Sequence, residues 1–126
     1  MKYINQEHKK FYHQTLKKDG IADTYRKALF YTSGIDKDCR SHIYELYDFE
    51  NHQIKLSSID QPWQTTGSMQ CTLLAFNLYN GYIYEQDKQL STPYDLFSSE
   101  YGFYFMESLK LRYPNQTKLK EKQGIR

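Results

Sequence analysis

Cysteine and histidine are the residues of this chain best suited to chemistry, and two of them lie close together. Cys39 is followed by Arg40 and, one helical turn on, by His42, near the start of a predicted helix. A cation and a helix start both lower the pKa of a thiol, and a neighbouring histidine is the base that a cysteine nucleophile requires. The alternative is a small residue that fills a gap in the core, and we expect that packing role.

The same pair could supply two ligands of a metal ion, but the rest of such a site is missing. Cys39 and His42 stand at positions i and i+3, and a structural zinc site needs two further ligands, for which His52 is the nearby candidate. Asp36 and Asp38 are spaced like the first ligands of a calcium loop, but a tyrosine takes the place of its bidentate glutamate. The sequence therefore predicts no metal centre and no other cofactor.

The remaining reactive groups do not converge on a catalytic arrangement. Cys71 lies in an apolar stretch, where burial raises the pKa of a thiol and keeps it inert. Asp48 and Glu50 could act as an acid and a base, yet two loop carboxylates more often bond helix ends or an arginine. The sequence holds no glycine-rich phosphate loop and no set of nucleophile, base and orienting group. We therefore predict that the protein is not an enzyme.

Four polar residues stand within aromatic or aliphatic sequence and are expected to form a structural polar cluster: Arg26, Asp48, Asn77 and Asn80. Partly buried polar groups need hydrogen-bond partners inside the protein. We expect Asp48 or Glu50 to pair with Arg26 or to cap a helix N-terminus. Such a bond would attach the central loop to the second helix, so the cluster is predicted to be architectural and not catalytic.

The element that must position these groups is the stretch from 68 to 80, which predicts a helix with two apolar faces. One face, by the 3.6-residue period, carries Cys71, Leu74, Ala75 and Leu78, and the other carries Met69, Leu73, Phe76 and Tyr79. No charged residue occurs between positions 60 and 85. A helix that is apolar on both faces must be enclosed by other elements, so we expect it at the centre of the fold.

The other segments predict amphipathic helices around this central one. Capping residues and glycines set the expected limits: 6–18 after Asn5 and before Gly20, 24–33 after Asp23 and before Gly34, 37–47 after Asp36, 93–97 after Thr92, and 100–112. Residues 54–56 alternate, but no sheet of consequence is expected, and the single tryptophan, Trp63, is expected to pack on the central helix. The fold class is thus all-α, a single-domain bundle of about five helices spanning 1–113.

Length and charge limit the possible partners. A chain of 126 residues with a net charge of +2 is one domain, and its 13 tyrosines indicate an amphipathic core and rim. Six basic residues and one acidic residue occupy 110–126, so 114–126 is predicted to be a basic, frayed tail beyond a mildly acidic body. Two cysteines, no apolar leader and no membrane-length apolar run predict a cytoplasmic protein with reduced thiols and no membrane contact.

Three segments give the chain a resemblance to a family of proteins. These are the runs at 25–31, 47–50 and 74–81, and the most specific is Ala-Phe-Asn-Leu-Tyr-Asn-Gly at 75–81; Glu7-His8, Tyr12 and Leu111-Arg112-Tyr113 fit the same pattern. The chain resembles, over about residues 3–113, a domain-of-unknown-function family of short proteins from Gram-positive bacteria and their mobile elements. The resemblance implies a bacterial, accessory protein. The family has no assigned activity, so it assigns no site residue.

Two functions of different class follow. The first is a non-catalytic module that binds another protein, as an adaptor or inhibitor, or binds itself as a homodimer; its candidate contacts are Tyr82, Tyr84, Tyr94 and Tyr101. The alternative is a nucleic-acid-binding accessory protein that uses the basic C-terminal end together with Lys9, Lys10, Lys17 and Lys18. A weaker third option is an enzyme built on Cys39 and His42. The acidic body argues against nucleic acid, so protein binding is the favoured prediction.

Overall fold

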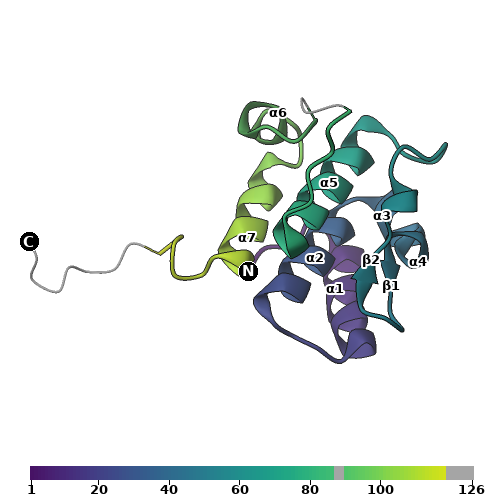
Figure 1. Ribbon diagram of the computed structural model, residues 1–126. Helices are drawn as coiled ribbons and strands as arrows, with labels where there is room; N and C mark the ends of the chain where they lie inside the picture. Colours follow the sequence, from purple (N-terminus) through teal and green to yellow (C-terminus); the bar gives the residue numbers. More distant parts are fainter. Residues whose placement is uncertain (87–89, 119–126) are drawn as a thin grey trace, which may run out of the picture.

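Helices account for most of the chain, as the sequence predicts. The computed structural model describes residues 1–86 and 90–118. Over these residues it contains seven helices, one 3-10 turn and a two-stranded hairpin (Figure 1): α1 Gln6–Asp19, α2 Thr24–Ile35, α3 Lys37–Ser41, α4 Ile43–Leu46, β1 Tyr47–Asp48, β2 Gln53–Ile54, η1 Leu56–Ser58, α5 Thr66–Asn80, α6 Pro93–Phe97 and α7 Gly102–Arg112. None of the helices in these residues is both long and apolar enough to cross a membrane.

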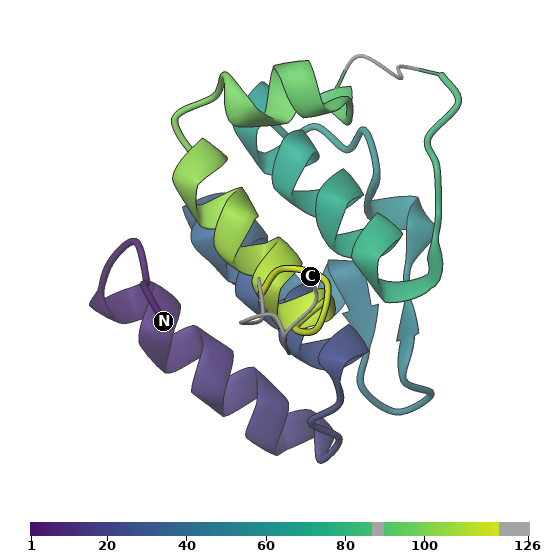
Figure 2. The ribbon, with the colours of Figure 1, turned by 90° about the vertical axis from the view of Figure 1, so that its left-hand side faces the viewer.

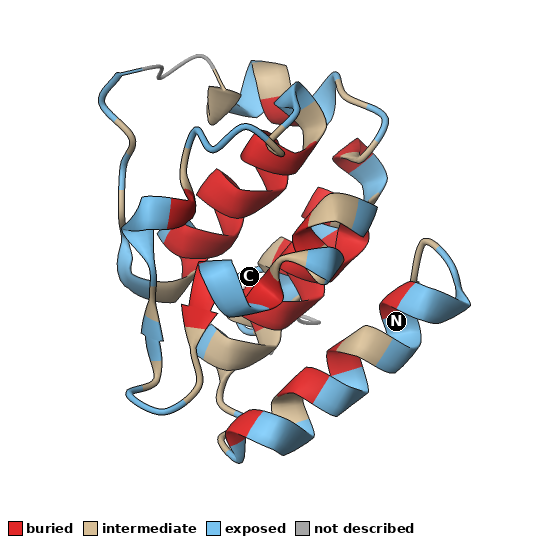
Figure 3. Cartoon of the chain, turned by 90° about the vertical axis from the view of Figure 1, so that its right-hand side faces the viewer, coloured by how far each residue is buried: buried red, intermediate tan, exposed pale blue. Residues whose placement is uncertain are grey.

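The centre of the bundle is occupied by α2. This helix packs against α1, α5 and α7, and every residue from 28 to 35 is buried. Figure 2 shows α7 lying in front of α2, with α1 on one side of this pair and α5 on the other. The predicted central helix, α5, is buried at every residue from 68 to 76, as expected (Figure 3), but it lies beside the centre.

A glycine explains how closely α1 approaches α2. Gly34 was predicted to end the second helix, and this is wrong, because α2 continues to Ile35. A Cβ at this position would lie 2.7 Å from the Phe11 ring and 2.9 Å from the His8 ring, both of which belong to α1. The absence of a side chain at Gly34 therefore lets the two helices meet at this point.

The limits of several helices are set by local caps. The Asn5 side chain accepts the His8 backbone N–H at 2.8 Å, and Thr65 and Ser68 form a reciprocal capping box at the start of α5. Gly20 and Gly81 end α1 and α5 in the left-handed conformation, with φ of +80° and +85°. The predicted ends of these two helices are confirmed.

The predicted third helix, 37–47, is interrupted. α3 ends at Ser41, His42 leaves helical geometry with φ −113° and ψ 27°, and α4 follows. The chain then forms an antiparallel hairpin in which Tyr47 pairs with Ile54. Trp63 stacks on the His42 ring, with the ring centres 4.1 Å apart, and donates its indole N–H to Glu45. The break thus provides a platform for the tryptophan, which was expected to pack on α5.

The last helix and the tail also differ from their predicted limits. α7 begins at Gly102, two residues later than expected, where a Cβ would lie 3.0 Å from the Phe97 carbonyl oxygen. After α7, Thr117 bonds back to the Tyr113 carbonyl, so 114–118 form a turn. The rest of the predicted tail, 119–126, lies outside the described residues.

Candidate functional site

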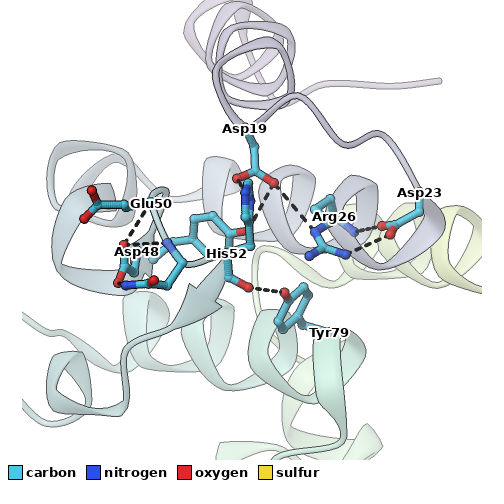
Figure 4. Close-up of polar contacts among 9 residues, drawn as sticks. Asp19, Asp23, Arg26, Asp48, Glu50, His52 and Tyr79 are labelled. Atoms are coloured by element: carbon cyan, nitrogen blue, oxygen red, sulfur yellow. Dashed lines mark hydrogen bonds and ion pairs between the residues drawn. The ribbon is translucent and has the colours of Figure 1, made fainter.

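A buried carboxylate at the end of α1 organises a polar network that joins several elements of the fold. The Asp19 side chain is fully buried, although it lies at the negative end of the α1 dipole, where a carboxylate is unfavourable. Its oxygens contact His52 Nδ1 at 2.7 Å, the Tyr47 hydroxyl at 3.1 Å and Arg26 Nε at 3.6 Å (Figure 4). Arg26 also donates to Asp23 at 2.8 Å. The Arg26 guanidinium therefore offsets the charge of Asp19, and the His52 ring and the Tyr47 hydroxyl hydrogen-bond its oxygens.

The same network fixes the hairpin to the helices. His52 has a left-handed backbone with φ +56°, and the Tyr79 hydroxyl of α5 donates to its carbonyl at 2.7 Å (Figure 4). The Arg26 guanidinium lies 5.2 Å from the centre of the Tyr79 ring. Side chains from α1, α2, β1 and α5 thus meet at one histidine and one carboxylate.

An aspartate that orients a histidine is also a catalytic arrangement, so its surroundings decide its chemistry. A hollow of about 290 Å³ lies beside His52. It is lined by His52, Gln53, Ile54, Leu56, Tyr79, Asn80 and Tyr82. The hydroxyls there are phenolic, and the Tyr79 hydroxyl is already used on the His52 carbonyl. No serine, threonine or cysteine is among these lining residues, so none of them offers a side-chain hydroxyl or thiol nucleophile of the usual kind beside His52.

The predicted polar cluster is not one site. Arg26 pairs with Asp23 and Asp19, so its predicted pairing with Asp48 or Glu50 is wrong. Asp48 instead bonds to Asn51, whose side chain and backbone N–H lower the pKa of Asp48, and it also accepts the Glu50 backbone N–H. Its carboxylate is used by the tip of its own hairpin.

The two asparagines of that cluster lie elsewhere, at the end of α5. The Asn77 side chain donates to the Tyr82 carbonyl at 3.1 Å, and the Asn80 side chain accepts the Tyr82 N–H at 3.1 Å. Together they hold the chain as it leaves α5. The four residues therefore form separate groups of local hydrogen bonds and not one cluster.

Asp19 and His52 were missed by the sequence reasoning, although Asp19 gave a signal. It continues the buried stripe of α1 that runs through His8, Tyr12 and Thr15. A charged residue on a buried stripe, placed where the helix dipole opposes it, requires cationic partners. Nothing in the local pattern identifies His52 as that partner, because 33 residues separate the two.

Both cysteines are buried thiols. Cys39 Sγ lies 3.4 Å from the Ser68 carbonyl oxygen and 3.4 Å from the Thr72 hydroxyl. Burial raises the pKa of Cys39 despite the Thr72 hydrogen bond, and burial raises the pKa of Cys71 as well. The lowered pKa considered for Cys39 is therefore wrong, because the effect of burial on the thiol exceeds that of the helix start. The Arg40 side chain donates to the Gly34 carbonyl and not to Cys39.

The hydrogen bonds of His42 do not go to Cys39. Its Nδ1 lies 2.9 Å from the Asp38 carbonyl oxygen, so this nitrogen carries the proton, and its Nε2 lies 3.8 Å from a Glu45 carboxylate oxygen. Both ring nitrogens thus face groups of the polypeptide. Over the described residues, no three side chains of histidine, cysteine, aspartate or glutamate come together as metal ligands.

A second histidine, His8, is wholly buried between α1 and α2. The Ile4 backbone N–H donates to its Nδ1 at 3.1 Å, so the proton must lie on Nε2, which faces the Tyr31 carbonyl oxygen at 2.8 Å. The pKa of His8 is lowered to about 4, mainly because the imidazole is buried. The hydrogen bond to the Tyr31 carbonyl acts to raise this pKa, and the charge of Arg40 acts to lower it. The neutral imidazole is therefore part of the core.

The four tyrosines predicted to bind a protein have different environments. Tyr94 is 82% exposed. Tyr101 donates its hydroxyl to Asp36, the N-cap of α3, at 2.8 Å. Tyr82 and Tyr84 are partly buried, and the Tyr82 ring meets Phe76 edge-on. Of the four, Tyr94 is the one that presents most of its ring to solvent.

Exposed apolar side chains gather around Tyr94 on α6 and α7. We define the α6–α7 face by four side chains that are more than a third exposed: Tyr94, Phe97, Phe103 and Met106. α6 packs directly against α7, and Met1 lies beside it, since the Lys2 N–H contacts Glu107 at 3.4 Å. Figure 2 shows α6 at the upper end of α7, with the segment that follows α7 in front of the lower end of that helix.

The four lysines predicted to bind nucleic acid are exposed but do not form one strip. At 100° per residue, Lys10 and Lys17 lie on the outer side of α1, and Lys9 and Lys18 lie on opposite flanks. Lys18 Nζ lies 5.5 Å from the Tyr44 ring centre and 5.6 Å from that of Phe49. The charges are therefore distributed around the helix.

The geometry described so far is that of a helical protein with a structural polar network and an exposed apolar face. Comparison with known proteins places the chain in a family: the model of DUF6075, a family of unknown function, matches residues 1–124, and the chain belongs to it. The predicted membership of a family of unknown function is confirmed; the bacterial and mobile-element origin stays a prediction. No curated protein and no solved structure matches the chain.

Proposed function

We propose that this protein is a non-catalytic interaction module that binds another polypeptide through the α6–α7 face. The observation that carries the proposal is the concentration of exposed apolar side chains. Ten large hydrophobic side chains are exposed over the described residues; four of them make up this face, Tyr94, Phe97, Phe103 and Met106, and a fifth, Tyr113, directly follows α7. Contiguous exposed apolar side chains, aromatic and methionine in particular, are typical of protein-binding surfaces.

The chemistry of the other sites supports the same proposal. The Asp19–His52 pair lacks a hydroxyl or thiol to activate, and burial keeps the two thiols protonated. The face itself carries apolar rings and a thioether, which favour desolvation by a protein partner over recognition of a charged polymer. Adaptor and inhibitor roles are both compatible with such a surface.

Nucleic-acid binding through Lys9, Lys10, Lys17 and Lys18 is the alternative outcome. Binding to phosphates would be strongly salt-dependent, whereas contact through an apolar face would not. Fluorescence anisotropy with random duplex and single-stranded DNA at low salt separates the two. Salt-sensitive binding that is lost on changing Lys10 and Lys17 to glutamine would replace the present proposal.

Site-specific photo-crosslinking in producing cells tests the face directly. A photoreactive phenylalanine at 103 probes the α6–α7 face, and the same group at Ile83, which is also more than half exposed, is the matched control. We expect a discrete protein adduct from position 103 and none from position 83. Equal labelling from both positions, or none from 103, would contradict the proposal.

A further inference from the structure

We infer that the partner seated on the α6–α7 face is a second copy of this chain, with the two α7 helices packed antiparallel about a two-fold axis. The inference rests on the proposed function, because it names the occupant of the same face. It is carried by the spacing of the exposed side chains on α7, by their self-complementary order and by the apolar area that the face offers.

The exposed side of α7 has the spacing of a helix-pairing seam. Its outward residues are Phe103, Met106 and Lys110, at intervals of three and four, and Tyr113, the first residue after the helix, follows three residues later and is also exposed. This 3-4-3 spacing is the one that places side chains along the line of contact between two packed helices. The opposite side of α7 carries Phe105 and Ser108, which are buried against the body of the protein. The seam is therefore left without a helix over it in the described residues.

The residues of the seam are arranged so that two antiparallel copies place similar side chains opposite each other. If two copies of α7 run antiparallel and the two-fold axis crosses them at the level of residue 108, Phe103 of one copy faces Tyr113 of the second. At the same level Met106 faces the second copy's Lys110. Each ring then meets a ring, and the thioether meets the methylene stem of a lysine. A two-fold contact requires this kind of self-complementary surface.

The charge in the middle of the seam, Lys110, has a partner within its own chain, and at the end of the seam the Arg112 guanidinium lies 4.6 Å from the Tyr113 ring centre and donates to the Leu78 carbonyl. Lys110 Nζ lies 3.0 Å from Glu107, which also contacts the Lys2 N–H. Burial acts to raise the pKa of Glu107, but these two hydrogen bonds lower it overall, so the carboxylate stays ionised. Covering the stem of Lys110 therefore leaves no unpaired charge in the interface.

The area of the face is sufficient for association. The exposed fractions are 82% for Tyr94, 38% for Phe97, 59% for Phe103, 46% for Met106 and 36% for Tyr113. With about 200 Å² for each such side chain, they offer roughly 520 Å² per copy, or about 1,040 Å² for a pair. Specific interfaces begin at about 1,000 Å² in total, so the pair lies at the weak end of that range.

Sedimentation equilibrium of the full chain tests the inference, from about 1 to 500 µM, the range suited to a small interface. We expect the mass to rise from 15.2 kDa to twice that value with concentration. Met106→Lys places a cation opposite the second copy's Lys110 and should weaken the dimer at least tenfold, in the manner of a central interface residue. Ile83→Lys makes the same kind of change on another surface and should leave the dimer intact.

A variant of opposite charge tests the antiparallel register. Met106→Glu places a carboxylate opposite the second copy's Lys110, keeps the Lys110–Glu107 pair, and should weaken the dimer far less than Met106→Lys. Far-UV circular dichroism checks that each variant is folded. A wild-type chain that stays monomeric at every concentration, a dimer indifferent to Met106→Lys, or a Met106→Glu dimer as weak as that of Met106→Lys would overturn the inference. A monomer that still crosslinks from position 103 to a different protein would leave the proposed function standing.

Discussion

Acidification should destabilise this protein through one buried residue, His8. Its imidazole is neutral, has no exposed surface and uses both nitrogens in hydrogen bonds. Its pKa falls from 6.5 in the unfolded chain to about 4 in the folded protein. Between these two values the unfolded chain binds a proton that the folded protein excludes. Stability is therefore complete above pH 6.5 and is lost as the pH falls toward 4.

The size of this loss follows from the two pKa values. At about 1.4 kcal/mol for each tenfold difference in proton affinity, the full change is about 3 kcal/mol, of which about 2 kcal/mol is lost by pH 5. Urea denaturation followed by far-UV circular dichroism at pH 7, 6, 5 and 4.5 gives the free energy of unfolding at each pH. Carboxylates contribute mainly below this window, so most of the slope from pH 6.5 to 5 should come from His8.

The matched control is His8→Gln, which keeps a donor for the Tyr31 carbonyl but does not titrate. We expect this variant to be less stable than the wild type at pH 7, because the Ile4 N–H loses its acceptor. We also expect the difference between the two proteins to shrink by about 2 kcal/mol on going to pH 5. Parallel pH profiles for the two proteins would refute the reasoning, since His42 and His52 are present in both.

Three further predictions concern the buried groups. Asp19→Asn should lower the free energy of unfolding by about 2–3 kcal/mol, because it leaves the partly buried Arg26 guanidinium without its buried carboxylate. Asp23→Asn, which keeps the N-cap, should cost less than about 1 kcal/mol, and equal losses in urea melts would contradict this. Gly34→Ala should destabilise the folded protein by about 1–3 kcal/mol, because the added methyl group clashes with the Phe11 and His8 rings of α1. Replacing glycine by alanine inside a helix usually stabilises it, so the expected effect has the opposite sign. An unchanged melting temperature would argue against the close approach of the two helices. Cys39 and Cys71 should react with a disulfide reagent at far below the rate of free cysteine until the protein is unfolded in denaturant, and rapid labelling of either in the native state would contradict their burial.

The sequence by itself determined the local features of this fold. Asn5, Asp23 and Thr92 were identified as N-caps, and Gly20 and Gly81 as helix ends, and the structure confirms each of them. These assignments succeed because a cap is completed by groups within about four residues, so the information needed is present in the local pattern. The burial of α5 was predictable for a similar reason, since a helix without a charged face must be enclosed.

The tertiary structure decided how these helices are arranged and which side chains they bring together. Gly34 reads locally as a helix end but serves as the contact point of two helices, because α1 supplies the rings that lie against it. Asp19 bonds His52 because the hairpin packs against the end of α1. The Tyr101 hydroxyl bonds Asp36, which lies 65 residues away in the sequence. Local pattern specifies where backbone hydrogen bonds begin and end. Burial and ion pairing depend on the packing of elements that are distant in sequence. The same packing decides that Phe103 and Met106 on the outer side of α7 remain exposed to solvent.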